Sequence, residues 1–186
     1  MIDTERLRLA PPRVAEAAEA WRMLADPVTA RWNPAPGVVD EASAARWCAR
    51  RADWSGGDHV TLSILGRRSG AYLGDVSLHR ICHVQDTAEV GYRVTPAARG
   101  HGFAAEALDA LVAWGFRELR LVRVQLAHAV ANGASCGVAR RAGFALEGTL
   151  RAAYRYPDGV RYDEHLHARL VDDYSPPATR MFAPVV

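Results

Sequence analysis

The alternation of hydrophobic and polar residues predicts short β-strands in the first half of the chain. Residues 6–10 alternate apolar and charged side chains, which is typical of a half-buried strand, and a pair of prolines ends the run. Three further apolar runs are separated by turns rich in glycine and arginine: residues 59–65, 71–79 and 88–94. Because such short turns join strands that pair side by side, we predict an antiparallel meander.

A helix with one apolar face is predicted after this meander, at about residues 103–117. Its apolar positions recur at the period of an α-helix: Leu108, Leu111, Val112, Gly115 and Leu119. The next segment, residues 122–127, is rich in β-branched side chains and predicts another strand. A strand, a helix and a strand in this order form a right-handed crossover, so the two strands should be parallel neighbours.

The remaining segments complete a mixed fold. They are predicted as helices at 15–24, 41–54 and 135–142, a loop at 31–37, an extended segment at 144–155, a hairpin turn at 158–159 and a last strand at 162–170. The length of 186 residues suits one domain. We therefore predict a single α+β domain over residues 1–186, with its core at about 4–171 and an irregular tail over 172–186.

Composition narrows the classes of partner. A net charge of +2 gives no basis for binding nucleic acid or an anionic membrane. The longest apolar runs are far shorter than the ~20 residues that span a bilayer, and residues 1–12 lack a signal-peptide core. Cys48, Cys82 and Cys136 are scattered and odd in number, which suits reduced thiols. These features predict a cytoplasmic protein.

A glycine-bracketed turn precedes the helix at 103–117 and is the clearest chemical feature. Gly100 and Gly102 let the backbone approach a ligand closely, and the first N–H groups of the helix are free at its N-terminus. That arrangement binds phosphate groups, and Arg99 adds a charge that can fork onto their oxygens. The turn therefore predicts a phosphate or pyrophosphate site.

Two other phosphate-binding motifs resemble this turn. A Walker loop needs a lysine, and all 23 basic residues of this chain are arginines. The dinucleotide fingerprint matches as Gly100-x-Gly102-x-x-Ala105, which leaves a dinucleotide-binding oxidoreductase as an alternative. That motif also needs an acidic residue at the end of the next strand, where this chain has Leu126 to His128.

Several motifs together resemble the RimJ/RimL-type branch of the GNAT acyl-CoA-dependent N-acyltransferases. They are Thr4-Glu-Arg-Leu-Arg-Leu, Glu89-Val-Gly-Tyr, Arg99-x-x-Gly102-x-Ala104, Asn132-Gly-Ala-Ser135 and Arg141-Ala-Gly-Phe-Ala-Leu-Glu-Gly148, in the order of the family. The resemblance implies a mixed, mostly antiparallel sheet of about seven strands with about four helices, and a parallel strand pair splayed around the cofactor. It also implies a possible homodimer.

The same resemblance implies transfer of an acetyl group from acetyl-CoA to a primary amine, by direct attack and without a metal. The amine would be a protein N-terminus or a small molecule. The cofactor-binding residues carried over from the family's motifs are Tyr92, Val94, Arg99, Gly100, His101, Gly102, Phe103, Ala104, Asn132 and Ser135. For Asn132 and Ser135 the alternative is capping of the short helix that follows. A non-catalytic acyl-CoA-binding module is a further alternative.

Three residues are candidates for proton transfer. Glu89 is the first candidate for the base, and a structural ion pair with Arg93 is the alternative, because strand alternation puts both side chains on one face. By resemblance, Ser135 protonates the leaving thiolate, and Tyr154 is an alternative acid. His128 is a second possible base, although a buried histidine held by a backbone carbonyl is the favoured explanation.

The acceptor side is expected at two loops that contain Arg31, Trp32, Arg155 and Tyr162. Their arginines, with Arg161, also leave open an acid-ended acyl group such as succinyl. No metal site is predicted. His79, Cys82 and His83 lack a second ligand pair at zinc-site spacing. His165 and His167 share one face of the last strand, and, as for His128, burial in the protein interior explains them.

Overall fold

The structure is a computed structural model that describes residues 1–173. One sheet contains eight strands in the order β1-β2-β3-β4-β5-β6-β8-β7. Their bounds are β1 Ile2–Asp3, β2 Leu7–Ala10, β3 His59–Gly66, β4 Tyr72–Cys82, β5 Thr87–Val94, β6 Arg123–Ala129, β7 Ala145–Arg155 and β8 Arg161–Leu170. All neighbours are antiparallel except β5 and β6. The predicted α+β fold with one parallel pair is therefore confirmed.

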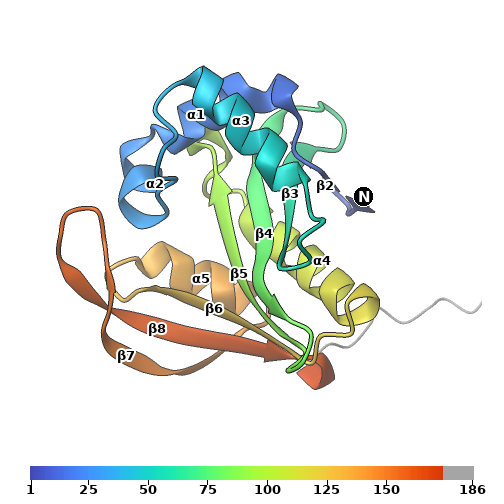
Figure 1. Ribbon diagram of the computed structural model, residues 1–186. Helices are drawn as coiled ribbons and strands as arrows, with labels where there is room; N and C mark the ends of the chain where they lie inside the picture. Colours follow the sequence, from blue (N-terminus) through green and yellow to red (C-terminus); the bar gives the residue numbers. More distant parts are fainter. Residues whose placement is uncertain (174–186) are drawn as a thin grey trace, which may run out of the picture.

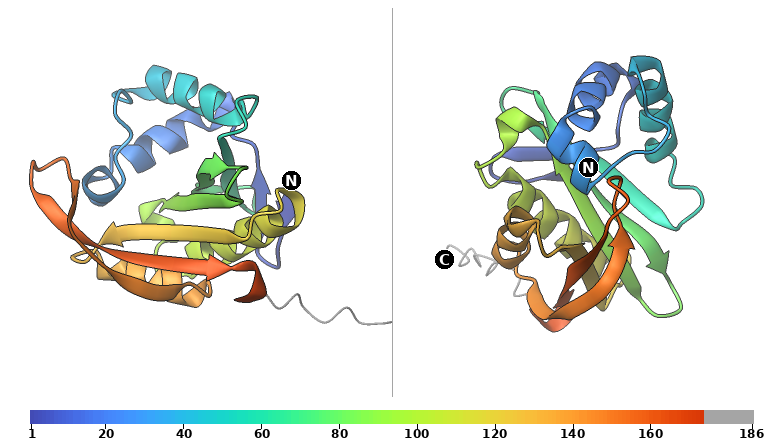
Figure 2. Two further views of the ribbon diagram at one scale, coloured as in Figure 1. Left: turned by 60° about the horizontal axis from the view of Figure 1, so that its bottom comes forward. Right: turned by 90° about the vertical axis from the view of Figure 1, so that its left-hand side faces the viewer.

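Helices cover both faces of the sheet. The α-helices are α1 Ala17–Leu24, α2 Pro27–Trp32, α3 Glu41–Ala52, α4 Phe103–Glu118 and α5 Gly133–Arg141, and the short 3-10 turns are η1 Val14–Glu16, η2 Pro96–Ala98 and η3 Val171–Asp173. Figure 2 shows α4 and α5 on one side of the sheet, with α1 and α3 on the other side over β3 and β4. The apolar face of α4 buries Leu108, Leu111 and Val112 completely against the sheet, as its spacing predicts.

Two elements go beyond the sequence prediction, which expected about seven strands and four helices. One is β1, a two-residue strand paired with β2. The other is α2, which takes up part of the predicted loop at 31–37 and starts with Pro27, capped by the Asp26 carboxylate. Of the predicted tail over 172–186, residues 174–186 lie outside the described part of the chain.

The parallel pair is joined only at its beginning. β5 and β6 pair at Thr87 with Arg123, Ala88 with Val124 and Glu89 with Gln125, and no pairing follows within either strand. Beyond this point the strands diverge, and Figure 1 shows the gap opening toward α2 and the β7–β8 hairpin. The backbone of residues 90–94 therefore has no strand partner on the side of β6, and this open edge is the position of the candidate site.

Candidate functional site

A cleft of about 270 Å³ fills the space between the diverging strands. It is bordered by the last residues of β5, the end of β6, the loop before α4, the start of α5 and part of α2. Of the cofactor-binding residues predicted from sequence, the cleft is lined by Tyr92, Val94, Arg99, Gly100, Gly102, Phe103, Ala104, Asn132 and Ser135. The structure thus brings together two motifs that are about thirty residues apart in sequence.

The loop before α4 has the backbone form that an anion site needs. Gly100 and Gly102 both adopt left-handed conformations, with φ of 80° and 78°. Gly102 is the N-cap of α4, and no side chain within residues 1–173 caps the first turn of the helix. The N–H groups at residues 103–105 therefore point out of the helix end, with the positive end of its dipole behind them. His101, the remaining predicted residue of the loop, stacks its ring on Phe103.

Arg99 is bonded within the protein and does not extend freely over the loop. Its guanidinium donates to the Asp26 carboxylate and, at 3.1 Å, to the Thr29 hydroxyl. The hydrogen bond from Arg99 holds the pKa of Asp26 below its ordinary value. Because Asp26 also caps α2, this contact joins the start of α2 to the glycine loop. Whether Arg99 also contacts phosphate stays a prediction.

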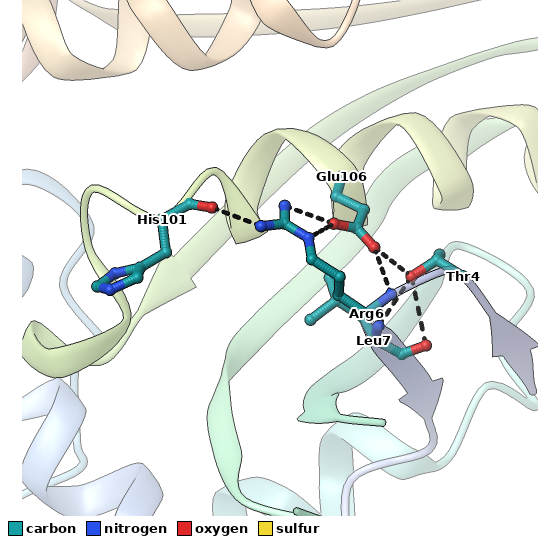
Figure 3. Close-up of polar contacts among 5 residues, drawn as sticks. All are labelled: Thr4, Arg6, Leu7, His101 and Glu106. Carbon is teal, nitrogen blue, oxygen red and sulfur yellow. Dashed lines mark hydrogen bonds and ion pairs between the residues drawn. The ribbon is translucent and has the colours of Figure 1, made fainter. Parts of the chain in front are cut away.

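A second arginine, which the sequence analysis did not single out, supports the same loop from outside (Figure 3). Arg6 donates to the His101 carbonyl at 3.0 Å and to the Glu106 carboxylate at 2.7 Å. Glu106 also accepts from the Thr4 hydroxyl at 2.5 Å and from the Arg6 backbone N–H at 3.0 Å. Burial alone would raise the pKa of Glu106, but the bonds from Thr4 and Arg6 outweigh it and the pKa is lowered.

The segment after α2 is bound to β5 by side chains. Asn33 donates from its amide to the Tyr92 carbonyl at 2.9 Å. Arg93 donates to the backbone carbonyls of Asn33 and Pro34, at 3.0 and 3.3 Å, and forms a buried ion pair with Asp75 at 3.2 Å. These contacts fix the wall of the cleft beside α2. They were not predicted, because none of them has a signal in local sequence.

Tyr92 and Ser135 meet across the cleft. The Tyr92 hydroxyl on β5 donates to Ser135 Oγ on α5, at 3.1 Å. Burial raises the pKa of Tyr92, so its hydroxyl keeps its proton at neutral pH. Asn132 caps α5, because its side-chain oxygen accepts from the Ser135 N–H at 3.4 Å. Asn132 therefore caps α5, which is the alternative role given for it above. The hydroxyl of Ser135 does not cap the helix and accepts from Tyr92.

Glu89 lies at the last paired position before the strands diverge, and it does not line the cleft. Its carboxylate accepts from Arg80 at 3.0 Å and from the Gln125 amide at 3.3 Å. The alternative ion pair with Arg93 is not formed, since Arg93 pairs with Asp75. Glu89 would therefore have to take a proton from the cleft through an intervening water.

Aromatic rings from α2 and the β7–β8 hairpin gather at one side of the cleft, where Trp32 and Tyr156 line it. Trp32 makes edge contacts with Tyr156 and Tyr162, with ring centroids 5.4 and 5.8 Å apart. Arg31 lies over the Trp32 ring at 4.5 Å and donates to the Tyr162 hydroxyl at 3.2 Å. Arg31, Trp32 and Tyr162 are therefore together, whereas Arg155 bonds within its own hairpin, to the Gly159 carbonyl.

Tyr156 lines the cleft, and sequence reasoning missed it. It is 6% exposed, whereas the predicted Tyr154 is 51% exposed and does not line the cleft. The Tyr156 hydroxyl donates to Glu164 at 2.8 Å and accepts from the Ala129 N–H at 3.1 Å. Burial, reinforced by Glu164, raises the pKa of Tyr156 well above its ordinary value. The predicted residues Tyr154 and Arg155 pointed to this region but not to Tyr156 itself.

His128 lines the cleft from β6. Its Nδ1 is 2.8 Å from the Ala129 carbonyl, which matches the expectation of a buried histidine held by the backbone. Burial lowers the pKa of both His128 and its neighbour His167, so both rings are neutral near pH 7. Within residues 1–173, His79, Cys82 and His83 do not belong to a group of side chains that could hold a metal ion.

Comparison with known proteins agrees with this geometry. Residues 6–145 match the family model described as an acetyltransferase (GNAT) domain. A putative ribosomal N-acetyltransferase YdaF of Bacillus subtilis is 36% identical over 94 residues, and the ribosomal-protein-serine acetyltransferase of Escherichia coli is 37% identical over 101 residues. These matches cover 50% and 54% of this chain and 51% and 55% of the relatives. The chain thus spans about half the length of the curated relatives it matches.

A solved structure of RimJ from Mycobacterium smegmatis, in complex with CoA-disulfide, superposes with a TM-score of 0.80. It is 26% identical, and the match covers 90% of this chain and 83% of that one. Relatives of the RimJ/RimL type therefore appear in both sequence and structure, as the motifs predict. Within residues 1–173, no helix combines the length and the apolar character that crossing a membrane requires.

Proposed function

The chain belongs to the GNAT acetyltransferase family, and from this we propose that it transfers an acetyl group from acetyl-CoA to a primary amine. The observation that supports the proposal most strongly is the divergence of β5 from β6 after Glu89, directly beside the uncapped N-terminus of α4. An extended cofactor with a charged pyrophosphate and an amide-bearing arm fits both features at once.

The cofactor would bind in two parts. Its pyrophosphate would lie on the N–H groups of the loop and the first turn of α4, around Gly100 to Ala104. Its pantetheine arm would run along the free backbone of β5 near Val94 and reach Asn132 and Ser135. The dinucleotide alternative has no acidic residue where it needs one, since β6 ends in His128 and Ala129.

Direct attack by the amine on the thioester needs a proton acceptor and a proton donor. We assign Ser135 as the acid for the leaving thiolate, with Tyr92 supplying a hydrogen bond to its oxygen. Glu89, acting through water, is the first candidate for the base. A backbone N–H of the β5 edge near Val94 would stabilise the developing oxyanion, an effect of about 3 kcal/mol in other enzymes.

Acetyl is favoured over an acid-ended acyl group. A succinyl carboxylate would need one of the arginines predicted for it, Arg31, Arg155 or Arg161, to be free. Arg31 is already stacked on Trp32 and bonded to Tyr162, and Arg155 and Arg161 donate to carbonyls of their own hairpin. The acceptor is proposed to be a protein N-terminal amine, by similarity to relatives named for ribosomal proteins. A homodimer and a cytoplasmic location stay predictions.

The test combines cofactor binding with turnover. Calorimetric titration with acetyl-CoA, succinyl-CoA and NADH should show binding of acetyl-CoA, and release of free CoA should follow addition of peptides that begin with serine or alanine. Ser135→Ala should lower kcat by about 10²-fold or more while the Kd for acetyl-CoA changes by less than about threefold. The exposed Ser55→Ala is the matched control.

Other outcomes identify the alternatives. Loss of turnover in Tyr154→Phe but not in Ser135→Ala would make Tyr154 the acid. Equal or better turnover with succinyl-CoA would overturn the choice of acetyl. Binding of acetyl-CoA without turnover on any amine would indicate a binding module, and binding of NADH without any CoA compound would support the oxidoreductase reading.

A further inference from the structure

Three histidines and one cysteine meet next to the cleft, which one of the histidines lines, and the proposed acetyl transfer uses none of them. They are His128 on β6, His165 and His167 on β8, and Cys136 on α5. One possible ligand atom from each residue lies within 4.8 Å of those of the other three. From this grouping we propose a site for a single divalent transition metal of the zinc type, with a three-histidine, one-cysteine ligand set.

Strand register produces this grouping. β6 and β8 are antiparallel neighbours, and His128 stands directly opposite His165 while His167 is two residues further along β8. Residues two apart on a strand point to the same face, so all three rings lie on one side of the sheet. Figure 1 shows α5 running beside β6, and this helix brings Cys136 to the rings. Ring centroids of the three histidines are 5.3 to 6.1 Å apart.

The spacing is close to that of a tetrahedral zinc site. Zinc bonds of about 2.0 Å to nitrogen and 2.3 Å to sulfur place neighbouring ligand atoms about 3.3 to 3.6 Å apart. Nε2 of His128 and Nε2 of His167 are already 3.3 Å apart, and Cys136 Sγ is 3.9 Å from His167 Nε2. Small side-chain rotations would therefore bring the four atoms to ligand distance.

The surroundings of the rings also match those of metal ligands. Ligating histidines commonly hold their second nitrogen on a backbone carbonyl, and His128 Nδ1 lies 2.8 Å from the Ala129 carbonyl. His165 Nδ1 is buried and has no hydrogen-bond partner among residues 1–173. His167 is completely buried, whereas His165 and Cys136 are partly exposed, which gives an ion a path of entry.

The donor set selects the class of metal. Imidazole nitrogen and thiolate sulfur suit Zn²⁺ and its neighbours in the first transition series, whereas Mg²⁺ and Ca²⁺ prefer oxygen ligands. Binding would convert the Cys136 thiol to a thiolate and release one proton. The ion would join α5 to β6 and β8 immediately behind Ser135. It is additional to acetyl transfer and takes no part in a step of that reaction.

The experiment measures metal binding directly and does not depend on enzyme activity. The full chain is freed of metal with a chelator and titrated with Zn²⁺ in competition with a chromophoric chelator. Co²⁺ is then added to a second sample, because a cobalt–thiolate bond gives a charge-transfer absorption. The test variants are Cys136→Ser and His165→Gln, which change the two partly exposed ligands. Cys82→Ser and His83→Gln are matched controls on the β4–β5 turn, and circular dichroism checks the fold of each.

We expect one Zn²⁺ per chain, and binding at least about tenfold weaker in both test variants. The thiolate band of Co²⁺ should be lost in Cys136→Ser and kept in both controls. The proposal is overturned if the wild-type chain binds no stoichiometric Zn²⁺, if either test variant binds as tightly as the wild type, or if the controls lose affinity to the same extent.

Discussion

Glu106→Gln tests whether the carboxylate of Glu106 holds the N-terminal strand and the glycine loop together. The substitution keeps the size of the side chain and removes its charge. A glutamine oxygen can still accept from Thr4 or from the Arg6 N–H, but the second oxygen, which accepts from the Arg6 guanidinium, becomes a donor (Figure 3). The guanidinium then keeps only the His101 carbonyl as a partner in this cluster.

The expected loss of stability at pH 7 is about 1–2 kcal/mol. A hydrogen bond to a charged group contributes about 1.5–3 kcal/mol, but the Arg6 side chain is 46% exposed, so solvent screening reduces its share to about 1 kcal/mol or less. Affinity for acetyl-CoA should fall only severalfold. The substitution weakens the support of the glycine loop, but it removes no direct contact with the ligand.

The effect should depend on pH in one direction. The pKa of Glu106 is lower in the folded chain than its ordinary value of about 4.3. Its stabilisation is therefore complete above that value and is lost as the pH falls through the folded pKa. The difference in unfolding free energy between wild type and Glu106→Gln should be constant from about pH 6 to 8 and shrink below about pH 4.

Urea unfolding at several pH values, followed by circular dichroism, measures this difference. Glu118→Gln on the same helix is the control: its carboxylate is 57% exposed and lies 4.0 Å from Arg117, so we expect a change within about 0.5 kcal/mol. Equal losses in the two variants at pH 7, or a Glu106→Gln difference that persists undiminished at low pH, would refute the reasoning.

Three further predictions concern β5 and the residues that pack against it. Arg93→Met leaves Asp75, which is 1% exposed, without its counter-charge and should cost about 3–5 kcal/mol in urea unfolding; a loss below about 1 kcal/mol, or one no larger than in Arg117→Met, would contradict it. Gly74→Ala puts a Cβ 2.1 Å from the Arg93 carbonyl oxygen and should lower the free energy of unfolding by about 3 kcal/mol or more. Gly133→Ala is the control, because its Cβ would meet no atom within 4 Å, and it should not destabilise the chain. Similar melting temperatures for the two variants would argue against the clash. Tyr92→Phe removes the donor to Ser135 and should lower kcat about tenfold with little change in the Kd for acetyl-CoA; unchanged kcat would remove Tyr92 from the proton path.

The periodicity of the sequence was sufficient to place the long elements. The predicted helix at 103–117 is α4 at Phe103–Glu118, and the predicted strand at 59–65 is β3 at His59–Gly66. Both have many residues that repeat one period, so local preference and tertiary packing agree. The helix α2 has only six residues, followed closely by two prolines, and its pattern is too short to distinguish from a loop.

Side-chain partners were much harder to predict, because they depend on strand register and on contacts between distant segments. Alternation correctly placed Glu89 and Arg93 on one face, yet the neighbouring strand supplies Asp75 to Arg93 and Arg80 to Glu89. Tyr156 lies one residue beyond the end of β7, where alternation no longer tells which way a side chain points. The three histidines His128, His165 and His167 likewise come together only because β6 pairs with β8 in one register.

The open edge of β5 shows how the chain keeps a binding site available before a ligand arrives. Unpaired backbone groups would normally attract a neighbouring strand, and β6 is the obvious partner. The chain opposes this closure with side chains: Asn33 occupies the Tyr92 carbonyl, Arg93 holds the segment after α2 against β5, and Tyr92 bridges to Ser135. On its other side, β6 is fully paired with β8. The side-chain contacts of the folded chain would therefore keep β5 and β6 apart before the cofactor binds. Little of the binding free energy of the cofactor would then be needed to separate the strands.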